Sequence, residues 1–196
     1  SHHEFGFRDM TKAMKLGLVA GAGVLALSSA ASAPAAEKGV MLMNRIGPSK
    51  MELYVANADG TGEHRLLPNS QSLDYDASFS PDGKWIVFTS ERAGAGQGQA
   101  DLWRVHPDGT GLERLTSDPS LEDAGVLSPD GTKLAYVSTK GGAHTTNIWV
   151  LDLKTKKARN LTWEGKLTPS PTMNSFFRPS WSQDGQLIAF SSDRGE

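Results

Sequence analysis

The chain has 196 residues, a net charge of −2 and no cysteine. The balanced charge excludes the basic footprint of a nucleic-acid-binding protein, and the lack of cysteine excludes a disulfide framework, so a packed core must supply the stability. After residue 35, no apolar run reaches the roughly 18 residues that a membrane-spanning helix needs.

The N-terminal segment is typical of an export signal. Residues 1–9 are interpreted as a purification tag and vector scar. Residues 10–35 are interpreted as a secretory signal peptide, because lysines follow Met10, then the apolar run Leu16–Leu27, then small residues suited to cleavage. The apolar run is too short to cross about 30 Å of hydrocarbon, which favours a cleaved signal over a retained anchor. We therefore expect a periplasmic or secreted protein, with no membrane span after cleavage, whose mature part begins near residue 36.

The rest of the chain repeats one hairpin pattern three times, as SFSPDGKWIVFTS, GVLSPDGTKLAYVS and SWSQDGQLIAFSS. The period of about fifty residues is typical of repeat architectures. In Ser-Pro-Asp-Gly, the proline presets φ for a turn and the glycine accepts the left-handed conformation that follows. A second repeated pattern begins at Glu52, Asp101 and Asn147. Together they predict four short strands per period, the first of which is only SFS, VLS or SWS.

The predicted strands are apolar on both faces. Because side chains alternate along a strand, Ile86 and Phe88 point one way while Trp85 and Val87 point the other. A sheet with one solvated face would show polar residues at every second position. Two apolar faces instead indicate that each sheet lies between two others. The fold class is therefore predicted to be all-β, a β-propeller of four-stranded antiparallel blades.

Three stretches, FSPDGKWIVFTSER, DLWRVHPDGTGLERLT and RPSWSQDGQLIAFSSDRGE, resemble the repeat of the TolB-type (WD40-like) β-propeller family, and the resemblance covers residues 40–196. This resemblance implies an exported or periplasmic propeller that binds protein partners within envelope complexes and has no catalytic role. The alternative is the propeller of a larger enzyme, as in prolyl-oligopeptidase-like peptidases, where it gates, or in oligogalacturonate lyases. Proteins of the TolB type carry a small α/β domain before the propeller. No such domain is expected in this chain, so the resemblance to them is expected to be limited to the blades.

The propeller is expected over residues 36–196 and is incomplete. The chain contains two full and two partial blades, whereas rings typically close with about four to eight. We therefore interpret it as the N-terminal fragment of a longer exported protein, which is expected to self-associate through open blade edges such as Gln186–Ser192. The repeat units are expected at about 39–74, 75–123, 124–177 and 178–196.

The residues predict neither a catalytic site nor a cofactor or metal site. No serine lies in a G-x-S-x-G or S-x-x-K motif, and no histidine has a companion at a zinc-binding spacing. His64 and His106, beside turns, are interpreted as solvated surface residues. Glu122 and Asp123 are adjacent carboxylates, for which a solvated acidic crossover is favoured over a metal site.

Partner binding is expected on the face that carries the irregular loops, because rigid scaffolds place function on variable loops. The alternative is that these loops vary because nothing constrains them. Aromatic and arginine side chains anchor protein partners, and the loop histidine is added as a candidate. Burial of the aromatic side chains against the neighbouring blade is the competing interpretation. The candidate partner-binding residues are His144, Trp163, Phe176, Phe177 and Arg178.

Overall fold

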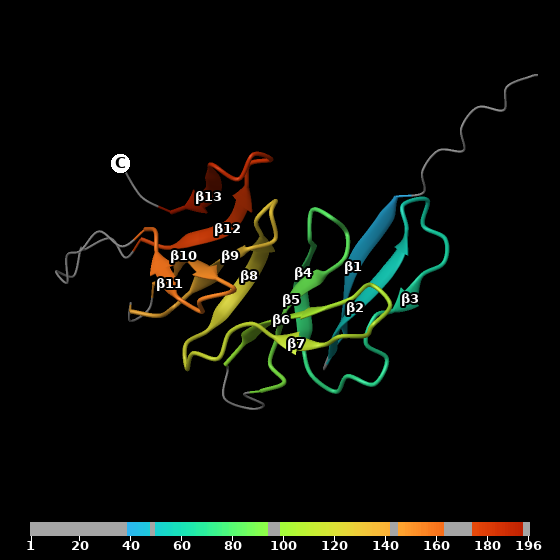
Figure 1. Cartoon of the computed structure of the whole chain (residues 1–196). Helices are drawn as coiled ribbons and strands as arrows, with labels where there is room; N and C mark the ends of the chain where they lie inside the picture. The colour runs from blue at the N-terminus through green and yellow to red at the C-terminus, as the bar shows by residue number, and fades with distance from the viewer. Residues whose placement is uncertain (1–38, 48–49, 94–98, 142–144, 163–173, 194–196) are drawn as a thin grey trace, which may run out of the picture. The chain divides into compact units, whose positions relative to one another are not determined.

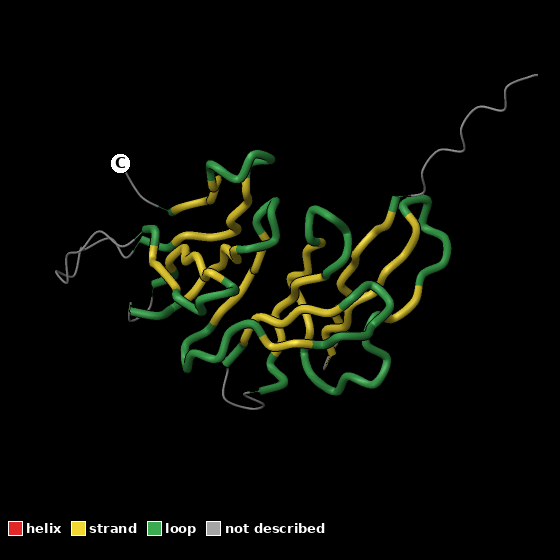
Figure 2. The backbone as a smooth tube through the Cα atoms, viewed as in Figure 1, coloured by secondary structure: helices red, strands yellow, loops and turns green. Residues whose placement is uncertain are grey.

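The structure is a computed structural model, and it describes residues 39–47, 50–93, 99–141, 145–162 and 174–193. These residues lie in one unit of the chain, residues 37–196. Their regular structure is entirely β-strand (Figures 1 and 2). Within these ranges there is no helix of the length and apolarity required to traverse a membrane.

The strands form four antiparallel sheets in chain order, which we call blades 1 to 4 (Figure 1). Blade 1 contains β1 (Val40–Gly47), β2 (Lys50–Asn57) and β3 (His64–Arg65). Blade 2 contains β4 (Asp74–Phe79), β5 (Ile86–Ser90), β6 (Asp101–Val105) and β7 (Glu113–Arg114). Blade 3 contains β8 (Glu122–Leu127), β9 (Lys133–Ser138), β10 (Asn147–Asp152) and β11 (Ala158–Asn160). Blade 4 contains β12 (Phe176–Trp181) and β13 (Ile188–Ser192). The predicted all-β arrangement of two full and two partial blades is confirmed.

Both faces of β5 are buried, as the alternation predicted. Ile86 and Phe88 pack with Leu53 and Val55 of blade 1, while Val87 packs with residues of blade 3. All three β5 side chains are fully buried. Burying one such side chain contributes about 1.5–3 kcal/mol of transfer free energy. Stacking of successive blades is therefore the main source of stability in this chain.

The repeated turn is locked by a side-chain hydrogen bond that recurs in every copy. Ser80 Oγ donates to Asp82 Oδ1 at 2.6 Å, and the same contact joins Ser128 to Asp130 and Ser182 to Asp184. The serine oxygen in turn accepts a hydrogen bond from the amide five residues further on, which is that of Trp85, Lys133 or Leu187. The glycine that follows each aspartate has a φ of 68° to 70°, where an L side chain is strained. The hairpin sequence recurs because each copy must make this same turn.

The first strand of each of blades 2, 3 and 4 is longer than predicted. β4, β8 and β12 each have six residues and begin slightly before the expected repeat boundaries. Each contains a register shift against its partner strand. One residue in each shifted stretch has a left-handed backbone: Asp76, Ala124 and Arg178, with φ of 45°, 52° and 51°. A bulge interrupts the two-residue alternation of side chains along a strand. The alternation pattern in the sequence therefore did not predict these longer strands.

Candidate functional site

In three blades, a polar side chain lies at the left-handed residue of the bulge or one residue before it. Strands β4, β8 and β12 are the first strands of their blades, and each packs against the next in chain order. We call Tyr75, Asp76, Asp123 and Arg178 the inner-strand cluster. Backbone strain at non-glycine residues is often a feature of functional sites, and here it recurs in blades 2, 3 and 4.

Asp123 is the fixed acid of the cluster. Its Oδ1 atom accepts a hydrogen bond of 2.7 Å from Thr89 Oγ1 and another of 2.7 Å from the amide of Ala124. The first bond links blade 3 to blade 2, and the second supports the left-handed residue of the bulge.

Asp76 is the acid that retains a proton more readily. Its carboxyl is exposed, yet the protein atoms around it remove part of its hydration, and this desolvation is the largest cause that raises its pKa. The charge of Asp123 and a side-chain hydrogen bond with Asp123 raise the pKa of Asp76 further, whereas the Arg178 guanidinium lowers it. Asp76 therefore keeps its proton to a higher pH than a free aspartate does.

Tyr75 adds a neutral hydrogen-bond donor beside these acids. Burial raises the pKa of its phenol to about 12, and the charges of Asp123, Glu91 and Asp76 act in the same direction. The phenol therefore keeps its proton at every physiological pH. The cluster offers a carboxylate acceptor, a phenol donor and a guanidinium, which suits it to binding polar groups of a partner. Among the described residues, no group of three or more His, Cys, Asp or Glu side chains is arranged to hold a metal ion.

The sequence-predicted candidates meet different outcomes. His144 and Trp163 lie outside the described residues. Phe176 is only 3% exposed, packs with Val137 and Ile148 of blade 3, and meets Phe190 edge to face at 5.7 Å. Phe176 is therefore a core residue of the joint between blades 3 and 4, which was the competing interpretation.

Phe177 and Arg178 lie at the surface. Phe177 is 41% exposed and Arg178 is exposed. Arg178 belongs to the inner-strand cluster because it lies near Asp76. The sequence analysis did not name Asp76 as a candidate residue. Phe177 precedes the bulge of β12 and occupies the position that Tyr75 holds in β4.

Two expectations about surface residues are corrected. His64 is exposed as predicted, but His106 is half-buried, stacks on Trp85 with ring centroids 3.8 Å apart, and has its Nδ1 2.9 Å from the carbonyl oxygen of Lys84. Glu122 was expected in a solvated crossover, yet it is 1% exposed. The reason is that β8 begins at Glu122 itself, whose side chain enters the space between blades 2 and 3.

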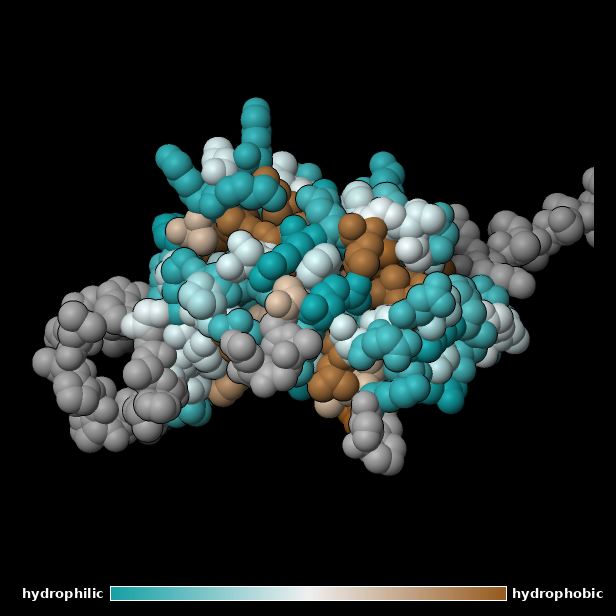
Figure 3. Space-filling model, turned by 90° about the horizontal axis from the view of Figure 1, so that it is seen from below, coloured by the Kyte–Doolittle hydropathy of each residue, from teal (hydrophilic) through white to brown (hydrophobic). Residues whose placement is uncertain are grey.

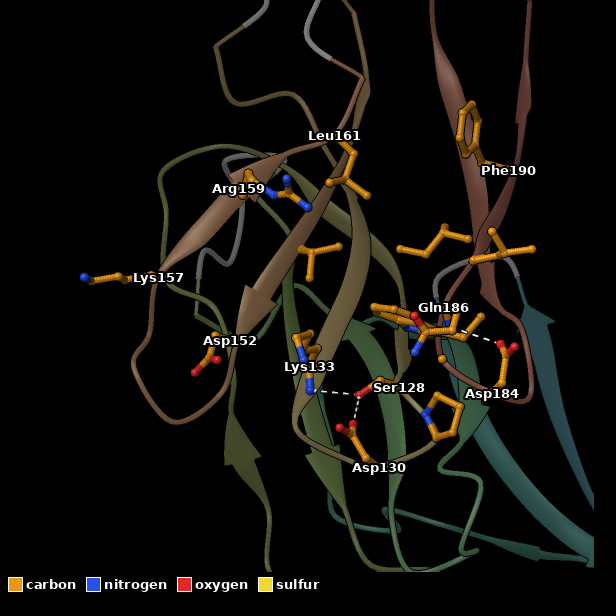
Figure 4. Close-up of a pocket in the computed structure, with 16 residues that line it drawn as sticks. Ser128, Asp130, Lys133, Asp152, Lys157, Arg159, Leu161, Asp184, Gln186 and Phe190 are labelled. Carbon is orange, nitrogen blue, oxygen red and sulfur yellow. Dashed lines mark hydrogen bonds between the residues drawn. The ribbon is translucent and has the colours of Figure 1, made fainter.

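A cavity lies away from the inner-strand cluster. It has a volume of about 660 Å³ and separates blade 3 from the β12–β13 hairpin, with Leu161 on one side and Phe190 on the other (Figure 4). Tyr136 is the counterpart of Phe190 in the repeat, and it packs with Leu151 of the next strand. No described residue supplies such a strand beside β13. The cavity is thus the unfilled part of a blade joint.

Exposed apolar side chains are spread over the described residues. On the face drawn in Figure 3, hydrophobic surface lies in separate patches between hydrophilic side chains. The blade 4 hairpin contributes Leu187, at 70% exposure, and Phe190, at 40%. The other large exposed apolar residues are Val40, Ile46, Leu112 and Phe177.

Comparison with known proteins identifies the fold family. The sequence pattern of the TolB beta propeller domain matches residues 22–175. The chain belongs to the TolB β-propeller family. A relative from this family, the Tol-Pal system protein TolB of Anaeromyxobacter dehalogenans, is 37% identical over 128 residues, which cover 65% of this chain and 28% of the relative. An uncharacterized protein of Agrobacterium fabrum is 32% identical over 143 residues, covering 71% of this chain and 46% of that protein.

Solved structures agree with this family. TolB from Acinetobacter baumannii has a TM-score of 0.56 and 27% identity, covering 76% of this chain and 34% of that one. An oligogalacturonate lyase in complex with manganese has a TM-score of 0.55 at 16% identity, covering 76% of this chain and 41% of the lyase, which is a likeness of fold. This TolB-family chain spans less than half the length of the curated relatives described above.

Proposed function

We propose that this TolB-family chain is exported to the periplasm and acts there as a non-catalytic scaffold that binds a protein of the envelope. The inner-strand cluster is the observation that carries the proposal, because three blades each present a polar side chain at the left-handed residue of the repeated bulge or one residue before it. The names of the relatives, which are Tol-Pal system proteins, support an envelope partner. The signal-peptide pattern of residues 10–35 supports export.

The chemistry of the cluster suggests how a partner would be held. Asp123 Oδ1 accepts hydrogen bonds from Thr89 and from the Ala124 amide. Asp123 therefore holds the bulge of blade 3 in place against blade 2. Asp76, which is exposed, and Tyr75 supply hydrogen bonds to polar groups of the partner. The Arg178 guanidinium suits a partner carboxylate, since arginine binds carboxylates through two parallel hydrogen bonds. Phe177 adds an exposed aromatic ring beside them.

The test is a binding titration with soluble Tol-Pal components from the same organism. Calorimetry would compare the full chain with two variants, Phe177→Ala and Arg178→Asn. Asparagine is chosen because it tolerates the left-handed backbone at Arg178. Removing a central anchor typically costs more than about 1 kcal/mol, or roughly five- to tenfold in affinity.

A matched control is Glu63→Gln, an acid near the β2–β3 turn whose carboxylate pairs with Arg45. This variant should bind like the parent chain. No detectable binding of any Tol-Pal component, or equal binding by all four proteins, would contradict the proposal.

A further inference from the structure

The acid that opens β4 has every hydrogen-bonding need met. Asp74 is 2% exposed. Its Oδ1 accepts hydrogen bonds from Ser90 Oγ at 2.6 Å and from Arg92 at 2.8 Å, and its Oδ2 accepts one from Ser70 Oγ at 2.6 Å. In blade 2, a basic residue just after β5 therefore pairs directly with the acid of the first strand.

Three of the four corresponding positions in blade 3 carry different chemistry, while Ser138 takes the place of Ser90. Glu122 replaces Asp74 and Lys140 replaces Arg92, while Asp118, an acceptor, replaces the donor Ser70. Lys140 Nζ lies 2.5 Å from Asp118 Oδ2 instead of pairing with the acid of the first strand. Glu122 is 1% exposed and its Oε2 atom has no hydrogen-bond partner among the described residues. In blade 3, unlike in blade 2, the basic residue does not pair with the buried acid of the first strand. One oxygen atom of that acid therefore has no hydrogen-bond partner among the described residues.

The groups that face Glu122 do not compensate a negative charge on it. Asp101 of β6 is buried, and its Oδ1 has no hydrogen-bond partner within the part of the chain that the structure describes. Its charge is compensated by Arg114 of β7 through a 2.8 Å contact. Asp118 of the crossover is neutralised by Lys140. The other facing groups are the Thr116 hydroxyl, the neutral phenol of Tyr136 and, at the cavity rim, Lys156.

Burial is the main reason that the pKa of Glu122 rises to about 7. The hydrogen bond with Thr116 opposes the rise, the charges of Asp118 and Asp101 add to it, and that of Lys140 opposes it. A buried carboxyl without a counter-charge holds its proton. In the structure, Lys140 pairs with Asp118 and not with Glu122. This pairing is expected when Glu122 is neutral, because a neutral carboxyl does not attract the ammonium group.

We propose that Lys140 moves from Asp118 to Glu122 when Glu122 loses its proton, and that this move releases the crossover between blades 2 and 3, residues 117–121. Blade 2 shows that a basic residue at this position can pair with the first-strand acid. A cavity of about 500 Å³, lined by Glu122, Asp118 and Lys140, gives the lysine room to move. This device does not depend on the proposed partner-binding function.

Release follows from the few contacts that hold the crossover. Asp118 anchors it by pairing with Lys140 and by accepting the hydrogen bond from Ser120 Oγ at 2.9 Å. The amide of Leu121 donates to Thr139 Oγ1 at 3.1 Å, and Gln99 reaches the carbonyl oxygen of Pro119 at 3.1 Å. When Lys140 leaves, Asp118 keeps its charge but loses its counter-ion, so the segment is held less tightly.

The test is amide hydrogen exchange by NMR on the full 196-residue chain from pH 6 to pH 8. After correction for the intrinsic pH dependence of exchange, protection of the Ser120 and Leu121 amides should fall severalfold, with a midpoint near pH 7. The control is the Gly131 amide, which donates to the carbonyl oxygen of Ser128 in a turn of the same blade. Its protection should not change over this pH range. Unchanged protection at Ser120 and Leu121 would overturn the proposal.

Two variants make the outcome specific. In Glu122→Gln, which carries no ionisable group, protection of the crossover should stay constant across this pH range. In Asp118→Asn, Lys140 loses the carboxylate that it pairs with while Glu122 is neutral. The crossover should therefore be weakly protected at both ends of the pH range. A fall in protection in Glu122→Gln equal to that of the parent chain would show that another group controls the crossover.

Discussion

Asp76 on β4 and Asp123 on β8 bring carboxyl groups of two blades together, and the charge of Asp123 raises the pKa of Asp76 after the larger effect of desolvation. Asp123 Oδ1 accepts hydrogen bonds from Thr89 and from the Ala124 amide. The pair therefore stores electrostatic repulsion whenever Asp76 ionises.

We predict that Asp76→Asn raises the melting temperature at pH 7. The asparagine amide can donate to Asp123 without a charge, and asparagine tolerates the left-handed backbone. The folded pKa of Asp76 is raised, so its destabilising effect is absent below the unfolded value of 3.8 and develops as the pH rises above it. Thermal unfolding followed by circular dichroism should show a gain at pH 7 and none near pH 3. A lower melting temperature at pH 7 would contradict the pairing.

A second prediction concerns the turn aspartate Asp130. Hydrogen bonds from Ser128 and Thr132 lower its pKa to about 2. The depressed folded pKa means that its stabilising effect is present above the unfolded value of 3.8 and is lost as the pH falls toward 2. Asp130→Ala should lower the melting temperature at pH 7 and lose part of the pH dependence between these values.

Ser128→Ala is the matched comparison for that turn. It removes the donor to Asp130 and the acceptor of the Lys133 amide, but leaves the hydrogen bonds from the amide and hydroxyl of Thr132 to Asp130. Its effect at pH 7 should be smaller than that of Asp130→Ala. Equal stability of all three proteins at pH 7 would mean that the turn is held by its backbone alone.

The sequence predicted the blades because their causes are local. The Ser-x-Asp-Gly turns and the two apolar faces of β5 follow from a few neighbouring residues, and both are found in the structure. The inner-strand cluster could not be found in this way. Asp76 and Asp123 come together only when blades stack, and the bulge between them interrupts the alternation on which strand prediction depends.

The burial of Glu122 was missed although the sequence contained a signal for it. Glu122 and Asp74 occupy the same position in the repeat, as do Lys140 and Arg92. An acid and a base kept at equal positions in two repeats indicate a structural pair rather than a solvated crossover. Which partner Lys140 chooses depends on side-chain lengths and distances that only the three-dimensional structure supplies.

Self-association through blade 4 is a third prediction. The side chain of Leu187 is 70% exposed, and β13 has no strand on its free edge among the described residues. Open apolar strand edges pair with other chains. Light-scattering chromatography should find the chain oligomeric, and Leu187→Lys should shift it toward the monomer. A parent chain that elutes as a sharp monomer would refute this.

Export is the fourth prediction. A reporter enzyme that folds only in an oxidising periplasm, fused after residue 40, should be active when residues 10–35 are present and inactive when they are deleted. Replacing a central leucine of the apolar run, such as Leu18→Arg, should also abolish reporter activity, because a charge prevents the run from entering the export machinery. Reporter activity that survives the deletion would rule out this segment as the signal.

The last prediction separates two adjacent phenylalanines of β12. Phe176 is 3% exposed and lies in the joint with blade 3, whereas Phe177 is 41% exposed. Emptying a buried phenylalanine site typically costs about 3–5 kcal/mol of unfolding free energy, while most surface substitutions stay within about 0.5 kcal/mol. Phe176→Ala should therefore unfold at much lower denaturant concentration than the parent chain, and Phe177→Ala should unfold close to it. Each variant serves as the control for the other, since both remove the same ring from neighbouring positions. If the two lose equal stability, β12 is seated differently against blade 3, and Phe177 is not free to contact a partner.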